Sequence, residues 1–289
     1  LNQSQDQLDA GFDYDVRAGV KRGIVAGFAL ALEAEGLTAA AATDLADVMR
    51  WDDARAQSPY ERVAQGVVDQ WADSSGDNSW RAVAVQLAAN QEFGLDLVAP
   101  EHWGDAARRE ADSLGADDQR SLRTVLRTMY ETTQRNLANE GIEELSLYRG
   151  MQNVPATVPG TFHVAALMLQ PLSSFSANIK TAADFAGHDD ALLLGARIPR
   201  QQIFSTSRTG LGCLDEFEVV VLGGTHRAVA YAPAVASTPA QMVEDFFNRA
   251  RAPKKAEPES LELRPDNDLV NADWPKRTPD VFPADEPAA

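Results

Sequence analysis

The hydrophobic pattern of the chain changes its period near Gly141, and this change limits the possible folds. Before it, apolar residues recur every three or four positions, which is typical of amphipathic helices. After it, short apolar runs rich in β-branched and aromatic residues alternate with Gly and Pro, which is typical of strands. The sequence therefore predicts an α+β fold, with a helical N-terminal half followed by a mainly antiparallel β-sheet core.

Two segments of the first half carry the helical pattern. In segment 13–36, four apolar residues predict the buried face of a helix: Val16, Val20, Ile24 and Phe28. Three glycines form a neighbouring stripe that would let a second helix approach closely: Gly19, Gly23 and Gly27. In segment 117–141 we expect Asp117 or Asp118 to cap a helix and Gly141 to end it. Its predicted buried face is Leu122, Val125, Leu126, Met129 and Leu137.

The second half reads as strands with one short helix, at 181–187. The strand-like segments are 144–150, 161–176, 191–199, 216–224 and 227–233. We therefore divide the chain into a helical segment (1–140), a β core (141–250) and a tail (251–289). Seven of the fifteen prolines lie in the last 39 residues, which is typical of an extended tail. The helical segment is either a separate adaptor or a helical lobe of the same domain.

Composition excludes several classes of function. A net charge of -17 argues against nucleic-acid binding, because neutralising phosphates needs clustered Lys and Arg. A single cysteine, Cys213, excludes an internal disulfide and a Cys-based zinc site, and the four histidines lack metal-ligand spacing. No apolar run is long enough to span a membrane, so we expect a soluble protein. Because the chain begins with Leu1 rather than Met, we expect a processed product or a fragment, and secretion or delivery stays open.

Two glutamates lead into the apolar run 219–222. On a strand, residues two apart point to the same face, so Glu216 and Glu218 would stand side by side with Phe217 turned the other way. Adjacent carboxylates repel each other, which makes the pair unusual as a structural element. In the alternative interpretation, Glu216 belongs to a solvated loop and only Glu218 begins the strand.

Other polar residues stand at the ends of predicted strands. Arg149 ends an apolar strand just before Gly150, and its planar fork suits a phosphate group, although a structural ion pair is the alternative. Ser173, Ser174 and Ser176 follow a second apolar strand, where serines are also common as turn residues. Each of these signals has a structural explanation when it is taken alone.

Taken in order, these segments resemble the Arg-Ser-Glu class of mono-ADP-ribosyltransferases, which includes the cholera-toxin-like and clostridial binary-toxin enzymes. The matching motifs are "YRG" at 148–150, "SFS" at 174–176, "AADFAG" with Phe185, and "EFE" at 216–218. Segment 203–224 also resembles the loop that precedes the catalytic glutamate in that class. The resemblance covers roughly residues 145–232, and it identifies 141–250 as an expected catalytic core.

The resemblance implies a bacterial or phage toxin or effector that transfers ADP-ribose from NAD+ to arginine side chains of a protein acceptor. NAD+ would be a consumed substrate, nicotinamide would leave, and no metal is required. Glu218 would grip a ribose hydroxyl and stabilise the positive charge that develops on the sugar. Glu216 would orient the acceptor guanidinium, whose pKa above about 12 keeps it charged and poorly nucleophilic. Arg149 would bind the pyrophosphate.

The remaining roles implied by the resemblance concern the nicotinamide side. Gly150 would give backbone access to the amide, and Phe185 would offer a flat face to the ring. Ser174 would hold the ribose side and orient Glu218, while Ser176 would support the strand and loop. Which of Ser173, Ser174 and Ser176 is functional stays open.

Two other functions stay open. In an NAD+ glycohydrolase, water would replace the protein acceptor, although a second glutamate, Glu216, argues against it. In a non-catalytic structural or adaptor protein, such as a phage or effector component, the helical half would dock onto a delivery or assembly partner.

Overall fold

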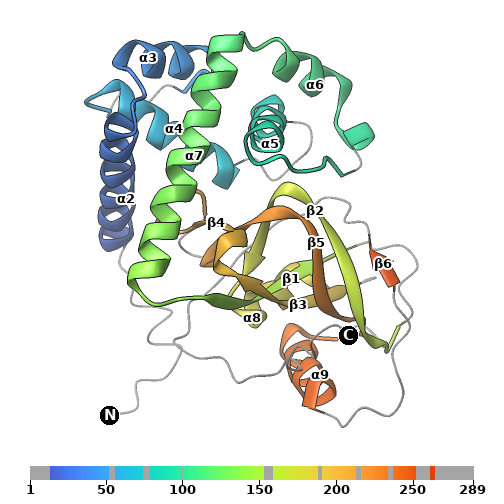
Figure 1. The fold of residues 1–289 in the computed structure, drawn as a ribbon. Helices are drawn as coiled ribbons and strands as arrows, with labels where there is room; N and C mark the ends of the chain where they lie inside the picture. Colours follow the sequence, from blue (N-terminus) through green and yellow to red (C-terminus); the bar gives the residue numbers. More distant parts are fainter. Residues whose placement is uncertain are drawn as a thin grey trace, which may run out of the picture.

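The computed structural model describes residues 14–51, 56–73, 79–98, 100–152, 159–187, 191–212, 216–233, 237–251 and 261–263. Within these residues helices fill the first half of the chain and strands most of the second, so the predicted α+β class is confirmed (Figure 1). The tail predicted at 251–289 lies outside the described residues, except for Arg251 and 261–263, and so does Cys213.

The helical half forms a layer over one side of the sheet (Figure 1). Its helices are α2 (Tyr14–Ala34), α3 (Ala39–Val48), α4 (Pro59–Asp73), α5 (Trp80–Phe93), α6 (Asp105–Asp112) and α7 (Ala116–Asn139), with a 3-10 turn at Pro100–His102. Side-chain caps fix several of these starts. In α4 the Ser58 hydroxyl accepts from the Glu61 amide at 3.1 Å, as in a capping box.

The strands form one sheet that closes on itself. They are β1 (Glu144–Met151), β2 (Phe162–Ser176), β3 (Leu192–Pro199), β4 (Ile203–Thr206), β5 (Glu218–Tyr231) and β6 (Leu261–Leu263). The order is β4-β5-β3-β1-β2-β6, and an additional pairing of β5 with β2 closes β1, β2, β3 and β5 into a barrel. These barrel pairings and that of β4 with β5 are antiparallel, while β6 pairs parallel with β2.

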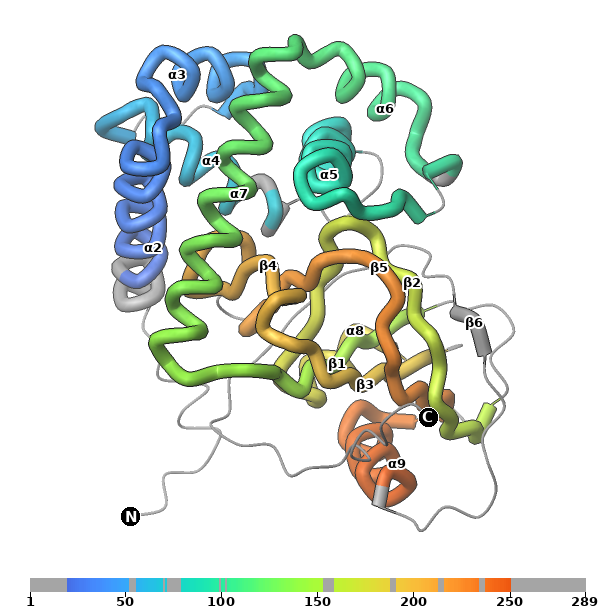
Figure 2. The backbone as a smooth tube through the Cα atoms, in the orientation of Figure 1, coloured from blue at the N-terminus to red at the C-terminus, as the bar shows by residue number. Residues whose placement is uncertain are grey.

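Three apolar cores hold the molecule together. The first core packs the helices, from α2 through α7, against one face of the sheet at Leu172, Phe204 and Val220. The second fills the barrel interior, with Phe175 and Val219 among its members. The third lies under α8 (Ile179–Ala186) and α9 (Pro239–Arg251), on the side of the barrel away from the helical half (Figure 2). Because the first core is continuous across both halves, it favours a helical lobe over a separate adaptor.

Helix α7 follows its sequence pattern, whereas α2 departs from it. All five residues predicted to be buried in α7 are buried, and Gly141 follows its end with a φ of 70°. In the part of α2 whose burial is described, 20–34, the buried residues are Val25, Phe28, Ala29 and Leu32, and the predicted Val16 lies outside that part. Val20 is 42% exposed, so the predicted face is wrong there. Residues four apart drift by about 40° per step on an α-helix, so a run of such steps leaves one face.

The predicted glycine stripe and the predicted cap are also wrong. A Cβ added at Gly23 or Gly27 would meet no atom within 4 Å, so none of the described helices approaches α2 closely at these two positions, while Gly19 lies outside the part of α2 whose side-chain surroundings are described. Helix α7 begins after Gly115, which makes no side-chain cap, and Asp117 and Asp118 lie inside the first turn. Carboxylates in that first turn still interact favourably with the positive end of the helix dipole.

The β half joins two predicted strands into one and contains elements that the sequence pattern did not predict. The predicted strands at 216–224 and 227–233 form the single bent strand β5. The short strand β4 and the helix α9 were not predicted. Helix α9 has a clear start signal, because the Thr238 hydroxyl accepts from the Gln241 amide and Gln241 accepts in return from the Thr238 amide.

Candidate functional site

The strand register brings three of the sequence motifs to one end of the barrel. Tyr148 on β1 lies opposite Ser176 on β2, and Ser176 lies opposite Glu218 on β5. The "YRG", "SFS" and "EFE" motifs are therefore neighbours across three strands, although up to 70 residues separate their ends in the sequence. This end of the β2 and β5 pair is called the glutamate end below.

A buried carboxylate is the centre of this end. The Ser174 hydroxyl donates a hydrogen bond to Oε1 of Glu218, and the indole Nε1 of Trp71 donates to the same oxygen at 2.7 Å. Ser174 is fully buried, Glu218 is 3% exposed and Trp71 is 8% exposed. Trp71 lies near the end of α4, so the helical half contributes directly to the cluster.

Burying a carboxylate is unfavourable unless hydrogen bonds or charges replace its hydration. Here a hydroxyl and an indole N–H supply that replacement, and hydrogen bonds to an ionised group contribute about 1.5–3 kcal/mol each. Ionisable groups are seldom buried this far for stability alone. A buried and hydrogen-bonded glutamate at a strand terminus is therefore a candidate catalytic group.

Glu216 does not share the strand with Glu218. Strand β5 begins at Glu218, and Phe217 has a φ of 50°, in the left-handed region that a bulky side chain rarely adopts. This conformation breaks the alternation of the strand, so the prediction that both glutamates stand side by side on a strand face is wrong, and the alternative interpretation, in which only Glu218 begins the strand, is confirmed. Glu216 belongs to the preceding turn and is half-buried, while Phe217 packs against the barrel interior.

Arg149 reaches the glutamate end from the barrel side of β1. It is 3% exposed, and its guanidinium carbon lies 6.0 Å from the centre of the Phe175 ring. Phe175 belongs to the barrel core, whereas the neighbouring Ser174 faces Trp71 and the helical half. An arginine buried beside an aromatic ring at this position could hold an anion, because its planar fork binds phosphate or carboxylate groups in pairs of hydrogen bonds.

Gly150 is required by the packing of α8 on β1. A Cβ at this position would lie 1.8 Å from the Ala182 carbonyl oxygen and 2.5 Å from the Ala186 nitrogen, so only glycine fits. The α8 backbone therefore lies directly on β1. Phe185 lies outside the buried stripe of α8 and is half-buried, and its carbonyl accepts from Gln152 Nε2 at 2.7 Å.

The three candidate serines have different partners. The Ser173 hydroxyl donates to the Gln170 carbonyl, and the Ser176 hydroxyl bonds the Asn178 carbonyl and accepts from the Asn178 amide. Of the three hydroxyls, that of Ser174 is the one whose hydrogen-bond partner lies on another strand, at Glu218 on β5. This pattern favours Ser174 as the residue that orients Glu218, and Ser176 as a residue that shapes the turn into α8.

A side chain from the helical half binds the backbone of β2 next to an irregularity in that strand. The register of β2 against β5 shifts between Leu169 and Leu172, around Pro171, which has no N–H. Gln86 on α5 donates to the Leu172 carbonyl at 2.8 Å and accepts from the Leu172 amide at 2.9 Å. Gln86 thus satisfies both backbone polar groups of Leu172, the residue at which the pairing with β5 resumes, immediately before Ser173 and Ser174.

Helix α7 holds the segment that precedes Glu218. The hydroxyls of Thr133 and Thr209 lie 2.7 Å apart, and the Leu211 amide donates to the Met129 sulfur at 3.3 Å. A Cβ at Gly210 would lie 2.6 Å from that sulfur, so the segment is pressed against the helix. The described part of the loop, 207–212, is therefore fixed by the helical half.

Two buried ionisable groups lie near these strands. Burial raises the pKa of Tyr148 to about 12, and its hydroxyl has no hydrogen-bond partner among the described residues. Burial also lowers the pKa of His226 on β5, whose Nε2 lies 3.0 Å from the Leu222 carbonyl oxygen. Both groups are therefore kept neutral near pH 7.

The described residues contain neither a metal-ligand cluster nor a helix that could span a membrane. No group of three or more His, Cys, Asp or Glu side chains in these ranges could hold a metal ion. In the same part of the chain, no helix has the length and apolar character needed to cross a membrane.

Sequence reasoning missed Trp71, Gln86 and Thr133, which all lie in the helical half and contact the β half. An apolar face on each helix was detectable, but which strand that face covers was not. Comparisons of the chain with protein-family models, with curated proteins and with solved structures found no match.

Proposed function

We propose that this protein is an NAD+-dependent mono-ADP-ribosyltransferase that modifies arginine side chains of a protein acceptor. The observation that carries the proposal is the buried hydrogen bond between Ser174 on β2 and Glu218 on β5. Strand β1, which bears Arg149, pairs with β2 at this same end of the barrel. The motif resemblance and this geometry are independent, because the sequence order of the motifs does not require their side chains to meet.

In the proposed reaction, Glu218 holds a ribose hydroxyl and stabilises the positive charge that develops as the bond to nicotinamide breaks. Nicotinamide leaves with the bonding electron pair. A guanidinium nitrogen of the acceptor attacks the anomeric carbon, and Glu216 takes up the proton that this nitrogen loses. Arg149 holds the pyrophosphate, and Phe185 lies against the nicotinamide ring.

The position of Glu216 in a turn is compatible with its proposed role. A group that meets a protein acceptor must be reachable from outside, and Glu216 is half-buried, whereas Glu218 is almost fully buried.

The direct test is the transfer of labelled ADP-ribose from NAD+ to an arginine-rich acceptor. We expect the wild-type protein to label the acceptor and Glu216→Gln to lose transfer while it retains NAD+ cleavage. Glu140→Gln, which changes an exposed glutamate at the end of α7, is the matched control and should behave as wild type. If the wild-type protein cleaves NAD+ and labels no acceptor, the glycohydrolase alternative replaces the transferase.

A further inference from the structure

We propose that Trp71 is a positioning residue that holds the carboxylate of Glu218 in the orientation needed for NAD+ cleavage. This inference rests on the proposed function and extends it to the helical half of the chain. Its basis is the 2.7 Å hydrogen bond from the indole Nε1 to Oε1 of Glu218, between residues that are 147 positions apart in the sequence.

Two donors from different elements meet at one carboxylate oxygen. The Ser174 hydroxyl approaches Oε1 from β2, and the Trp71 indole approaches it from α4. A glutamate side chain rotates about several bonds, and one hydrogen bond would leave its carboxylate plane free to turn. Two donors in fixed directions restrict that rotation, which is the preorganisation that electrostatic stabilisation of a transition state requires.

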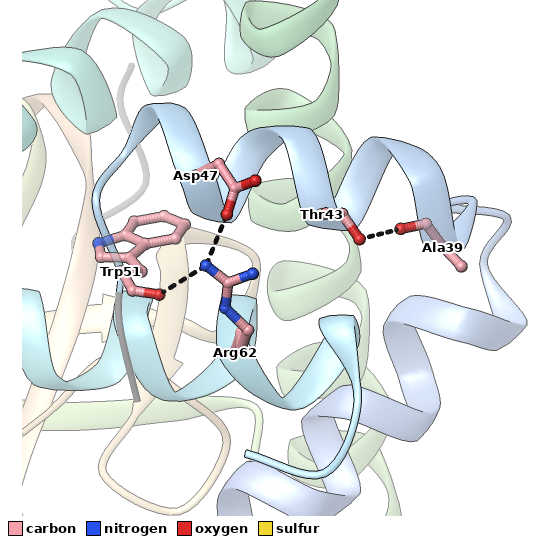
Figure 3. Close-up of polar contacts among 5 residues, drawn as sticks. All are labelled: Ala39, Thr43, Asp47, Trp51 and Arg62. Carbon is pink, nitrogen blue, oxygen red and sulfur yellow. Dashed lines mark hydrogen bonds and ion pairs between the residues drawn. The ribbon is translucent and has the colours of Figure 1, made fainter. Parts of the chain in front are cut away.

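The helix that carries Trp71 is itself held in place. A Cβ at Gly66 would lie 2.2 Å from Cγ of Trp51, so α4 packs on this indole ring with no space for a side chain. Arg62 donates to Asp47 on α3 at 2.7 Å and to the Trp51 carbonyl at 3.4 Å (Figure 3). Segments that open easily have few buried contacts, and α4 has many, so a fixed support fits better than a movable lid.

A further contact joins α4 to α2. Asp69, two residues before Trp71, forms an ion pair with Lys21 on α2 and also accepts from Gln65. Trp71 belongs to the core that joins the helices to the sheet, together with Val220 and Leu222 on β5. The indole is thus fixed from the helix side and from the strand side, and its N–H can serve as a rigid donor.

The test compares Trp71→Phe with Trp51→Phe in the full-length chain. Trp71→Phe removes the N–H donor and retains an aromatic ring. Trp51→Phe removes the same atoms from another buried indole that also contacts α4, and the Trp51 Nε1 has no hydrogen-bond partner among the described residues. The two variants therefore match in lost core volume and differ in the hydrogen bond to Glu218.

We expect Trp71→Phe to lower kcat for NAD+ cleavage by about ten- to a hundredfold with little change in KM. Phenylalanine retains the Cβ, Cγ and Cδ2 atoms of Trp51 that lie nearest Gly66, so Trp51→Phe should still support α4 and should have the kcat of the wild-type protein. Equal kcat values in Trp71→Phe and the wild type would overturn the inference and leave the proposed function standing. A lower KM with an unchanged or higher kcat would also overturn it, because Trp71 would then obstruct NAD+ instead of supporting Glu218.

A second measurement does not depend on activity. The chain has five tryptophans, so a nitrogen-15 spectrum can resolve their indole N–H signals, and the Trp71 signal is the one absent from Trp71→Phe. We expect this signal to shift in Glu218→Gln and in Ser174→Ala. A signal that stays in place in both variants would overturn the inference. A wild-type protein that does not cleave NAD+ would overturn the proposed function and this inference together.

Discussion

The two ends of the β2 and β5 pair bury polar groups in different ways. At the glutamate end, Glu218 is enclosed by the helical half and receives hydrogen bonds from Ser174 and Trp71. At the other end, where Phe162 lies opposite Tyr231, the Tyr231 hydroxyl bonds Asp245, an exposed residue of α9. This second end is called the tyrosine end.

The difference favours a role in stability for the tyrosine end and a role in the proposed reaction for the glutamate end. The tyrosine end buries a hydroxyl that is neutral near pH 7 and pairs it with a carboxylate that remains exposed, so no charged group is removed from water. The glutamate end removes an ionisable carboxylate from water and supplies donors from two distant elements. Since a buried carboxylate is harder to stabilise than a buried hydroxyl, the arrangement at the glutamate end favours a functional role. The predictions below separate the two ends by asking whether a change acts on stability or on activity.

The largest effect on stability is expected at the tyrosine end. Phe246 on α9 is fully buried, and its ring centre lies 6.0 Å from that of Tyr148 and 5.7 Å from that of Phe162. Phe246→Ala should lower the free energy of unfolding by about 3–5 kcal/mol. Denaturant unfolding measures this loss. NAD+ cleavage per folded molecule should be unchanged, and a loss of activity in the folded fraction would break the distinction between the ends.

An intermediate effect is expected at the irregularity between the two ends. Gln86→Ala leaves the Leu172 amide and carbonyl without the partners that Gln86 supplies, and should lower the free energy of unfolding by about 1–3 kcal/mol. Gln91→Ala, at an exposed position on the same helix, is the control. Because Ser174 lies just beyond the irregularity, we also expect reduced NAD+ cleavage. Equal stability of Gln86→Ala and Gln91→Ala would show that the irregularity needs no support.

The smallest effect separates two tyrosines whose pKa values are both raised to about 12. Burial is the cause for Tyr148, and burial together with Asp245 is the cause for Tyr231. Tyr231→Phe should lower the free energy of unfolding by about 0.5–1.5 kcal/mol at pH 7, because it removes a hydrogen bond. Tyr148→Phe should be neutral or slightly stabilising, since its hydroxyl has no partner among the described residues.

Unfolding at alkaline pH tests the burial of Tyr148 directly. A tyrosine whose pKa rises from 10.0 in the unfolded chain to about 12 in the folded protein stabilises the fold below pH 10. That stability is lost as the pH rises from 10 to about 12. The free energy of unfolding should therefore fall over this range, and Tyr148→Phe should make the fall less steep. An unchanged slope in the variant would show that Tyr148 is not buried as described.

The buried faces of the helices were predictable where the spacing of the apolar residues keeps those residues on one side of the helix. Leu122, Val125, Leu126 and Met129 stand at positions i, i+3, i+4 and i+7, which keeps them aligned along α7. The steps of four from Val16 to Phe28 do not. Helix α9 could have been found from Thr238 and Gln241, which form a capping box around Pro239, a residue favoured at the first helical position.

The candidate site was predictable only where its members lie in strands. Ser174 and Glu218 could be placed together because both stand at strand ends and the motif order suggested a shared site. Trp71 could not, since helical periodicity identifies an apolar face and not the polar group that it will meet. The turn at Glu216 depended on the left-handed backbone of Phe217, which no local residue preference indicates.

The most direct test of the account is the release of nicotinamide from NAD+ by the purified protein and by Glu218→Gln. The glutamine retains the shape of the side chain and an oxygen that can accept from Ser174, so both proteins should have the same fold by circular dichroism. We predict release by the wild-type protein and a rate at least about a hundredfold lower in the variant. Equal rates, or no release by the folded wild-type protein, would contradict a catalytic role for the glutamate end.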